Sequence, residues 1–164
     1  MIKAITAALL LSFSIVAFTQ PSPEQIAEYR AAAAKGEAWG QYNLGRMYAK
    51  GEGVAEDDAT AVKWYTKAAE QGYADAQFNL GLMYGNGRGV PEDDTTAVKW
   101  FTKAAEQGGA NAQYNLGFMY ANGRGVPEDD ATAVKWYTKA AEQGDAVEVG
   151  RTAGRTRASY PQFL

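Results

Sequence analysis

The chain has 164 residues, of which 46% are apolar, and its formal net charge is −3. This size and composition predict one folded domain and exclude a disordered or collagen-like class. Basic residues are interspersed with acidic ones, so we expect no nucleic acid partner. Cysteine and histidine are absent, which excludes disulfides, the usual zinc sites and nucleophiles paired with histidine. We expect no metal, no cofactor and no enzyme activity.

Residues 1–19 have the features of a secretory signal peptide. Lys3 precedes an uncharged run from Ala4 to Phe18, which is long enough for a signal peptide and short for a membrane-spanning helix. The small residues Ala17 and Thr19 fit a cleavage site. An uncleaved N-terminal anchor is the alternative. With cleavage, we expect a periplasmic or secreted protein that is not attached to a membrane.

A period of 36 residues governs the rest of the chain, and such a period is typical of repeat proteins. The period aligns Trp64 with Trp100 and Trp136. It divides the chain into units 36–71, 72–107 and 108–143. Residues 24–35 align with the second half of a unit, so we expect an additional helix before the first complete unit. Residues 145–164 no longer follow the pattern and form a divergent tail.

Each unit is predicted to contain two helices, as the last one illustrates. Apolar or small residues at helical spacing are Ala112, Leu116, Met119 and Tyr120 in its first half, and Ala133, Trp136, Tyr137, Ala140 and Ala141 in its second half. Gly123 and Gly125 permit a turn between these helices, and Asp129 or Asp130 can cap the second one.

One such helix pair is too small to bury its apolar face, so neighbouring units must stack. Gly45, Gly81 and Gly117 fall in the middle of the first helices, where glycine costs about 1 kcal/mol relative to alanine. We expect these glycines to allow the close approach of a bulky Trp or Tyr from a neighbouring helix.

The units follow the pattern A-x-A-Q-[YF]-N-L-G-x-M-Y-x-x-G-x-G-V-x-x-D-x-x-x-A-V-K-W-[YF]-x-K-A-A-E-Q-G, and the first unit departs from it only at Gly40, which replaces the second alanine. It resembles the Sel1-like repeat, a relative of the tetratricopeptide repeat, over residues 24–144. The resemblance implies an all-α fold, a right-handed superhelical solenoid of tandem helix-turn-helix repeats that serves as an adaptor for protein complexes. Bacterial members are often exported, and some are linked to host interaction or to β-lactam-like ligands. Cysteine-rich exported members pair cysteines within each repeat, and this chain has none.

The resemblance to tetratricopeptide arrays also implies that the first helices line a concave surface. Most differences between the three units fall in these first helices and in the loops after them. The candidate residues for binding a peptide or protein are Trp39, Tyr42, Asn43, Arg46, Asp75, Phe78, Asn79, Leu82, Asn111, Tyr114, Asn115 and Phe118. Asparagine amides can pair with an extended peptide backbone while the aromatic rings cover its side chains. Alternatively, the asparagines bond between neighbouring helices and the aromatic residues pack between repeats.

Three other patterns do not support a phosphate site, a calcium site or a serine nucleophile. The glycine-rich loops lack both a preceding strand and a Walker lysine, and the Glu-Asp-Asp triplets lack calcium-loop spacing. No serine is followed three positions later by lysine, as a penicillin-interacting enzyme requires. A receptor for C-terminal carboxylates is not supported either, because Arg46 is the only basic candidate on the predicted concave surface.

The last second helix repeats the internal ones, so its outer side should expose apolar surface. The tail could cover this side, a partner or a second copy could pack on it, or the gene could be truncated. We therefore expect an exported, non-catalytic scaffold for protein–protein interaction. The alternatives are an exported cell-wall or β-lactam-related enzyme or ligand-binder, and a structural protein that self-associates through the array end.

Overall fold

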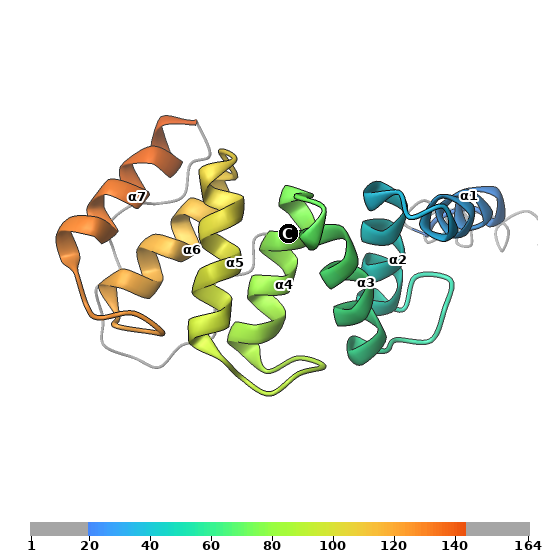
Figure 1. Cartoon of the computed structure of the whole chain (residues 1–164), viewed down its shortest axis with the longest axis horizontal. Coiled ribbons are helices and arrows are strands. Elements are labelled where there is room, and N and C mark those ends of the chain that lie inside the picture. The colour runs from blue at the N-terminus through green and yellow to red at the C-terminus, as the bar shows by residue number, and fades with distance from the viewer. Residues whose placement is uncertain (1–19, 144–164) are drawn as a thin grey trace, which may run out of the picture.

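The computed structural model describes residues 20–143, which fold into seven α-helices without a strand in that range (Figure 1). The helices are α1 (Pro23–Ala34), α2 (Ala38–Lys50), α3 (Asp58–Glu70), α4 (Ala74–Asn86), α5 (Asp94–Glu106), α6 (Ala110–Ala121) and α7 (Asp130–Glu142). The predicted all-α solenoid of helix-turn-helix repeats and its additional first helix are confirmed. The proposed signal peptide (1–19) and tail (145–164) lie outside the described residues.

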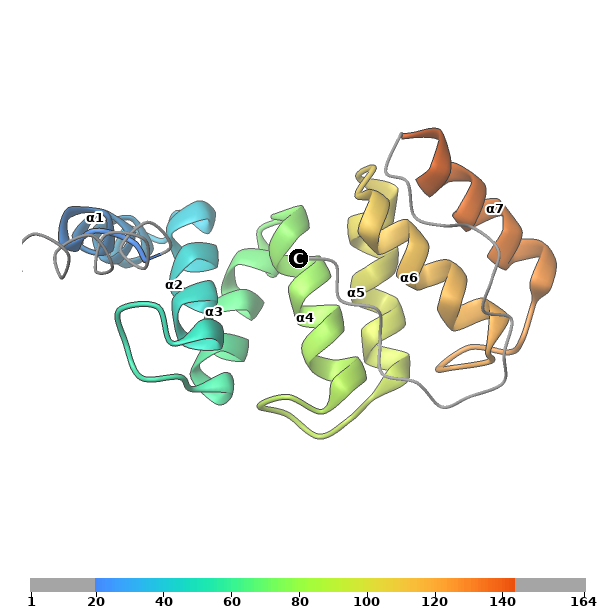
Figure 2. The ribbon, with the colours of Figure 1, turned by 180° about the vertical axis from the view of Figure 1, so that it is seen from behind.

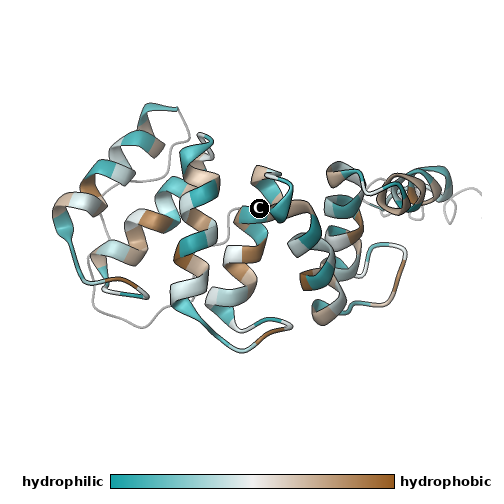
Figure 3. Ribbon diagram, in the orientation of Figure 1, coloured by the Kyte–Doolittle hydropathy of each residue, from teal (hydrophilic) through white to brown (hydrophobic). Residues whose placement is uncertain are grey.

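The helices form one row of consecutive pairs, α2 with α3, α4 with α5 and α6 with α7, and α1 stands before the first pair (Figures 1 and 2). Each helix carries both hydrophilic and hydrophobic residues (Figure 3), as expected for helices with one buried side. Among residues 20–143, no helix is long and apolar enough to cross a membrane.

The hydrophobic core is divided among the junctions between repeats. One cluster joins α3 to α4 through residues such as Val62 and Leu80, and a second joins α5 to α6 through Phe101 and Leu116. A third, smaller cluster joins α1 to α2. Each cluster thus lies between a second helix and the first helix of the next repeat, which explains why a repeat needs its neighbours.

Mid-helix glycines allow the two helices of one repeat to approach closely. A Cβ atom added to Gly45 would lie 2.6 Å from the Tyr65 ring, and one added to Gly81 would lie 2.6 Å from the Phe101 ring. Gly117 meets Tyr137 in the same way. The predicted close approach is confirmed, and the bulky partner is the Tyr or Phe of the second helix.

Aspartates cap the second helices. The Asp129 carboxylate accepts hydrogen bonds from the Thr132 backbone N–H at 3.0 Å and from the Thr132 hydroxyl at 2.7 Å. Asp57 and Asp93 make the same two contacts with the threonines three residues later. Of the two caps that the sequence left open, the structure therefore selects Asp129.

These caps predict a loss of stability in acid. The threonine hydrogen bonds hold the pKa of Asp57, Asp93 and Asp129 below the ordinary value of 3.8. A lowered folded-state pKa stabilises the protein above the ordinary value, and this contribution is lost as the pH falls through the folded pKa. The urea midpoint of the parent protein should therefore decrease below about pH 4.

The combined variant Asp57→Asn, Asp93→Asn, Asp129→Asn is the matched control, because asparagine is an equally good N-cap that does not titrate. Its urea midpoint should be close to that of the parent at pH 7 and should decrease less in acid. An equal decrease in both proteins would show that other carboxylates cause the acid loss.

In the second and third repeats, an arginine in the loop after the first helix bonds to the preceding repeat. Arg88 donates two hydrogen bonds to Asp58 at the start of α3, Nε to Oδ2 at 3.1 Å and Nη2 to Oδ1 at 2.7 Å. It also donates to the Ala49 carbonyl at the end of α2. Gly89, at φ 69°, lies so close that an added Cβ would collide with the Asp58 carbonyl. The loop therefore requires glycine beside the arginine.

Arg124 repeats this arrangement at the next junction. It binds Asp94 through two hydrogen bonds of 3.0 and 2.9 Å, and it also contacts Glu92 and the Gly85 carbonyl. The first complete repeat has Glu52 at the equivalent position, and Glu52 lies 3.5 Å from Arg46 of its own repeat. The junction with α1 therefore lacks the arginine contact.

Glutamines connect the opposite ends of the same helices. The Gln77 amide donates to the Ala69 carbonyl at the end of α3, and the Gln77 oxygen accepts from Gln107. Gln113 likewise donates to the Ala105 carbonyl and accepts from Gln143. Both ends of α3 and of α5 are therefore hydrogen-bonded to the following repeat.

Candidate functional site

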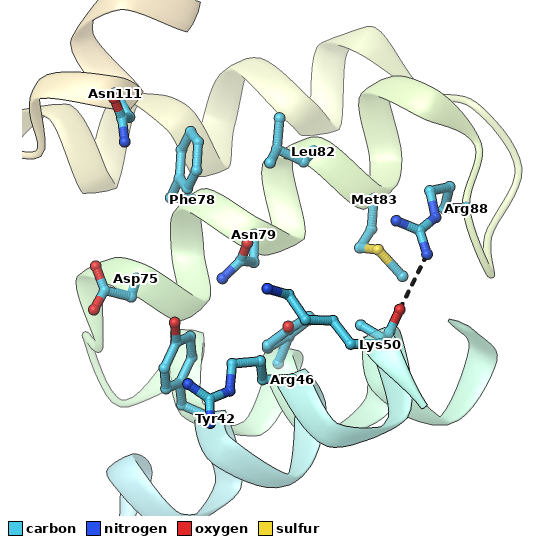
Figure 4. A pocket seen from close by; sticks show the side chains of 12 residues that line it. Tyr42, Arg46, Lys50, Asp75, Phe78, Asn79, Leu82, Met83, Arg88 and Asn111 are labelled. Atoms are coloured by element: carbon cyan, nitrogen blue, oxygen red, sulfur yellow. Dashed lines mark hydrogen bonds between the residues drawn. The ribbon is translucent and has the colours of Figure 1, made fainter. Parts of the chain in front are cut away.

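A groove of about 340 Å³ lies between the first helices of consecutive repeats (Figure 4). Its lining comes mainly from α2 and α4, with contributions from α3, from the loop after α4, and from the start of α6. The lining residues are Tyr42, Arg46, Ala49, Lys50, Tyr65, Asp75, Phe78, Asn79, Leu82, Met83, Arg88 and Asn111.

Many of the candidate residues predicted from the sequence line this groove together. They are Tyr42, Arg46, Asp75, Phe78, Asn79, Leu82 and Asn111. They meet because equivalent positions of neighbouring first helices lie on the same side of the solenoid, where stacked repeats bring them next to one another.

The remaining candidates lie outside the groove. Trp39 packs edge-on against Tyr29 of α1, with ring centroids 6.1 Å apart, and its indole N–H donates to Glu37. Tyr114 packs against Tyr137 in a tilted arrangement, with ring centroids 5.1 Å apart, and Phe118 packs against the cluster between α5 and α6. These aromatic side chains pack within the array.

The asparagines do not form one continuous row. Asn43 and Asn115 donate their amides at 2.8 Å to backbone carbonyls of their own helices, and Asn115 is fully buried. Asn79 instead lines the groove together with Tyr42 of the preceding repeat. Asn43 and Asn115 thus bond within their own helices, and not between neighbouring helices as the sequence left open.

Aromatic residues form a largely fixed wall of the groove. Tyr42 lies 5.0 Å from Tyr73 and 5.9 Å from Tyr65, measured between ring centroids. Phe78 lies 6.0 Å from Phe101. Burial raises the pKa of the Tyr42 hydroxyl, and the nearby Asp75 carboxylate raises it further. Tyr42 is therefore a neutral hydrogen-bonding group throughout the physiological range.

Side chains of opposite charge lie at different positions along the groove. Lys50 is exposed and reaches toward the centre of the groove, while Asp75 lies at the end beside Tyr42 (Figure 4). Arg88 is held by Asp58, and its guanidinium lies on the far side of Lys50 from Asp75. The groove can thus accept an acidic group near Lys50 and a basic group near Asp75.

Sequence reasoning did not select Lys50, Arg88, Ala49, Tyr65 or Met83. Lys50 and Arg88 occupy positions where the repeats differ, as Asn86 and Glu52 at equivalent positions show. That variation was the available signal. Tyr65 and Met83 belong to the buried core, so no sequence pattern could identify their exposed edges.

The chemistry available in the groove is that of binding. Aromatic faces, amides, three basic side chains and one carboxylate surround a channel open to solvent. Across residues 20–143, no group of three or more His, Cys, Asp and Glu side chains could hold a metal ion.

Comparisons with known proteins agree with this architecture. The Sel1 repeat model matches residues 40–73, 74–109 and 110–145, which are more than half of the chain. No curated protein matches the sequence. A protective antigen of uropathogenic Escherichia coli with an SLR fold is 50% identical, with a TM-score of 0.71 over 71% of this chain and 25% of that protein.

Two further solved structures are similar. A Sel1 repeat protein from Oxalobacter formigenes is 41% identical, with a TM-score of 0.71 over 74% of this chain and half of its own. Helicobacter pylori cysteine rich protein B is 24% identical and shares the fold, with a TM-score of 0.60 over 75% of this chain and 88% of its own. The three matched repeats, together with this shared fold, show that the chain belongs to the Sel1 repeat family.

Proposed function

We propose that the chain is an exported, non-catalytic scaffold that holds an extended peptide segment of another protein in the groove between α2 and α4. The observation that carries this proposal is the combination of aromatic, amide and oppositely charged side chains in one open channel. Sel1 repeat proteins generally serve as protein-interaction scaffolds. Export follows from the predicted signal peptide and implies a periplasmic or secreted protein.

A peptide fits this channel better than a small substrate does. The Asn79 and Asn111 amides lie on neighbouring first helices, and each offers a donor and an acceptor for peptide groups. The rings of Tyr42 and Phe78 offer apolar faces for alternate side chains of an extended segment. Lys50 and Asp75 would then set its direction, with an acidic residue near Lys50.

The proposal is tested with peptides selected from a random library on the folded mature protein and measured by calorimetry. The combined variant Lys50→Glu, Asp75→Lys changes two exposed groove residues without removing core contacts. It should weaken the selected peptides by tenfold or more, which corresponds to about 1.4 kcal/mol. Circular dichroism and urea unfolding check that the variant is folded.

The matched control is Lys63→Glu, Glu70→Lys, which makes the same charge changes at exposed positions of α3 outside the groove. This control should bind the peptides as the parent does. Equal binding by both variants would place the peptides on another surface. If the library gives no binder, the groove is not a peptide site.

A further inference from the structure

The last helix has the same sequence as an internal one, but no helix within residues 20–143 follows it and covers its outer side. Helices α3 and α7 both read DATAVKWYTKAAE. In α3, the side that faces the next repeat packs against Ala76, Leu80 and Met83 of α4. In α7, the corresponding side has no following first helix among the described residues. One sequence therefore shows both the covered and the open form of the same surface.

Exposure of the apolar residues shows how open this surface is. Val62 and Val98, which face the next repeat, are 7% and 8% exposed, whereas Val134 at the equivalent position is 61% exposed. Ala69 and Ala105 are buried, whereas Ala141 is exposed. The exposed apolar side predicted for the last helix is thus confirmed.

The polar contacts of the internal junctions are also unfilled here. Asp58 and Asp94 each bind the loop arginine of the next repeat, but Asp130 is exposed and makes no ion pair within the described residues. The Ala69 and Ala105 carbonyls each accept from a glutamine of the next repeat. No glutamine side chain in residues 20–143 donates to the equivalent Ala141 carbonyl, which within this range receives only the backbone N–H of Gln143.

We propose that the outer side of α7, formed by Asp130, Val134, Tyr137 and Ala141, binds the first helix and loop of a Sel1 repeat that belongs to another protein. The internal junctions define the required chemistry: a leucine and methionine ridge, a glutamine near the helix start, and an Arg-Gly pair in the loop. This surface is separate from the groove between α2 and α4, so the proposal does not rest on peptide binding.

The identity of the occupant follows from what covers the same surface at the internal junctions, which is a first helix and the loop after it. The residues after Gln143 read GDAVEVGRTAGRTRASYPQFL and do not contain the A-x-A-Q-[YF]-N-L-G-x-M motif of a first helix. A second copy does not offer a free first helix, because α1 covers α2 and Glu52 replaces the loop arginine. An array that opens with a first helix offers the complementary surface.

The test uses a fluorescent synthetic peptide of residues 72–107 as the probe, titrated into the mature protein and followed by anisotropy. Val134→Asp should weaken binding at least tenfold. The matched control Lys135→Asp should leave it unchanged, because the equivalent Lys63 and Lys99 stay exposed at the internal junctions.

The binding mode is tested by pairing Asp130→Asn in the protein with Arg88→Ala in the peptide. Each change alone should weaken binding several-fold, and the two together should weaken it no more than one alone. Independent, additive losses would mean that the peptide does not use the Asp130 contact, and would overturn the proposed arrangement.

A second format covers the case in which the free peptide folds too poorly to bind. Residues 72–107 are fused after Gln143. The fusion should raise the urea midpoint, and Val134→Asp should abolish this increase. Failure in both formats overturns the proposal, and stabilisation in the fusion supports it even when the free peptide does not bind.

Other occupants give distinct results. If the protein dimerises without peptide and Val134→Asp prevents this dimerisation, the surface binds a second copy. A large gain in peptide affinity on deleting residues 145–164 would assign it to the chain's own tail. Either result overturns the proposal.

Discussion

Replacing Gly81 with alanine is expected to destabilise the protein, although alanine is the better helix former. In an exposed helix this change would stabilise by about 1 kcal/mol. Here the new Cβ would lie 2.6 Å from two carbons of the Phe101 ring, which is fully buried in the cluster between α5 and α6. Overpacking of this kind costs about 1–3 kcal/mol, so the urea midpoint should decrease.

The control replaces Phe101 with a smaller side chain, which should relieve the clash with the new Cβ of residue 81. Phe101→Leu alone should destabilise by leaving unfilled space, but Gly81→Ala combined with Phe101→Leu should lose less than the sum of the single changes. Additive losses, or stabilisation by Gly81→Ala alone, would show that α4 and α5 can separate without cost.

Replacing Arg124 with alanine is expected to have the other large effect on stability. The guanidinium makes charged hydrogen bonds to Asp94 and Glu92, and its side chain is 15% exposed. Hydrogen bonds to charged groups contribute about 1.5–3 kcal/mol each, and removal of Arg124 takes two charged hydrogen bonds away from Asp94. We expect a loss of about 2–3 kcal/mol, measured by urea unfolding.

Comparison among the arginines tests the cause. Arg88→Ala should cost less than Arg124→Ala, because the Arg88 side chain is 37% exposed and solvent screens its contacts. Arg46→Ala should cost the least, since Arg46 lies 3.5 Å from Glu52 within its own repeat. Arg124→Lys should not restore stability, because lysine cannot make the two-atom contact with Asp94. Equal losses at all three positions would contradict a role for the junction contact.

The architecture could be predicted because the residues that determine helices, loops and caps recur at the same positions in each repeat. The period, the loop glycines and the capping aspartates fix where helices begin and end, and the glycines at positions such as 81 indicate a close helix contact. The arginine contact was not predicted, because it joins Arg88 to Asp58 across 30 residues and no local pattern connects them.

The candidate site was harder to predict because the same residue type at equivalent positions lies in different structural environments. Asn79 faces the groove, whereas Asn115 is buried and bonded within its helix. The groove also lies at the junction that has Arg46 and Lys50, whereas the equivalent Leu82 packs against the core of the next junction. Such differences depend on neighbours that a single repeat does not specify.

The division of the core among junctions has a consequence for how the chain folds. Each cluster joins a second helix to the first helix that directly follows it, so no contact has to wait for distant parts of the chain to meet. Low contact order of this kind favours rapid folding, and order can spread from any junction to its neighbours. The smallest cluster joins α1 to α2, so thermal fluctuations should open the array from its N-terminal end.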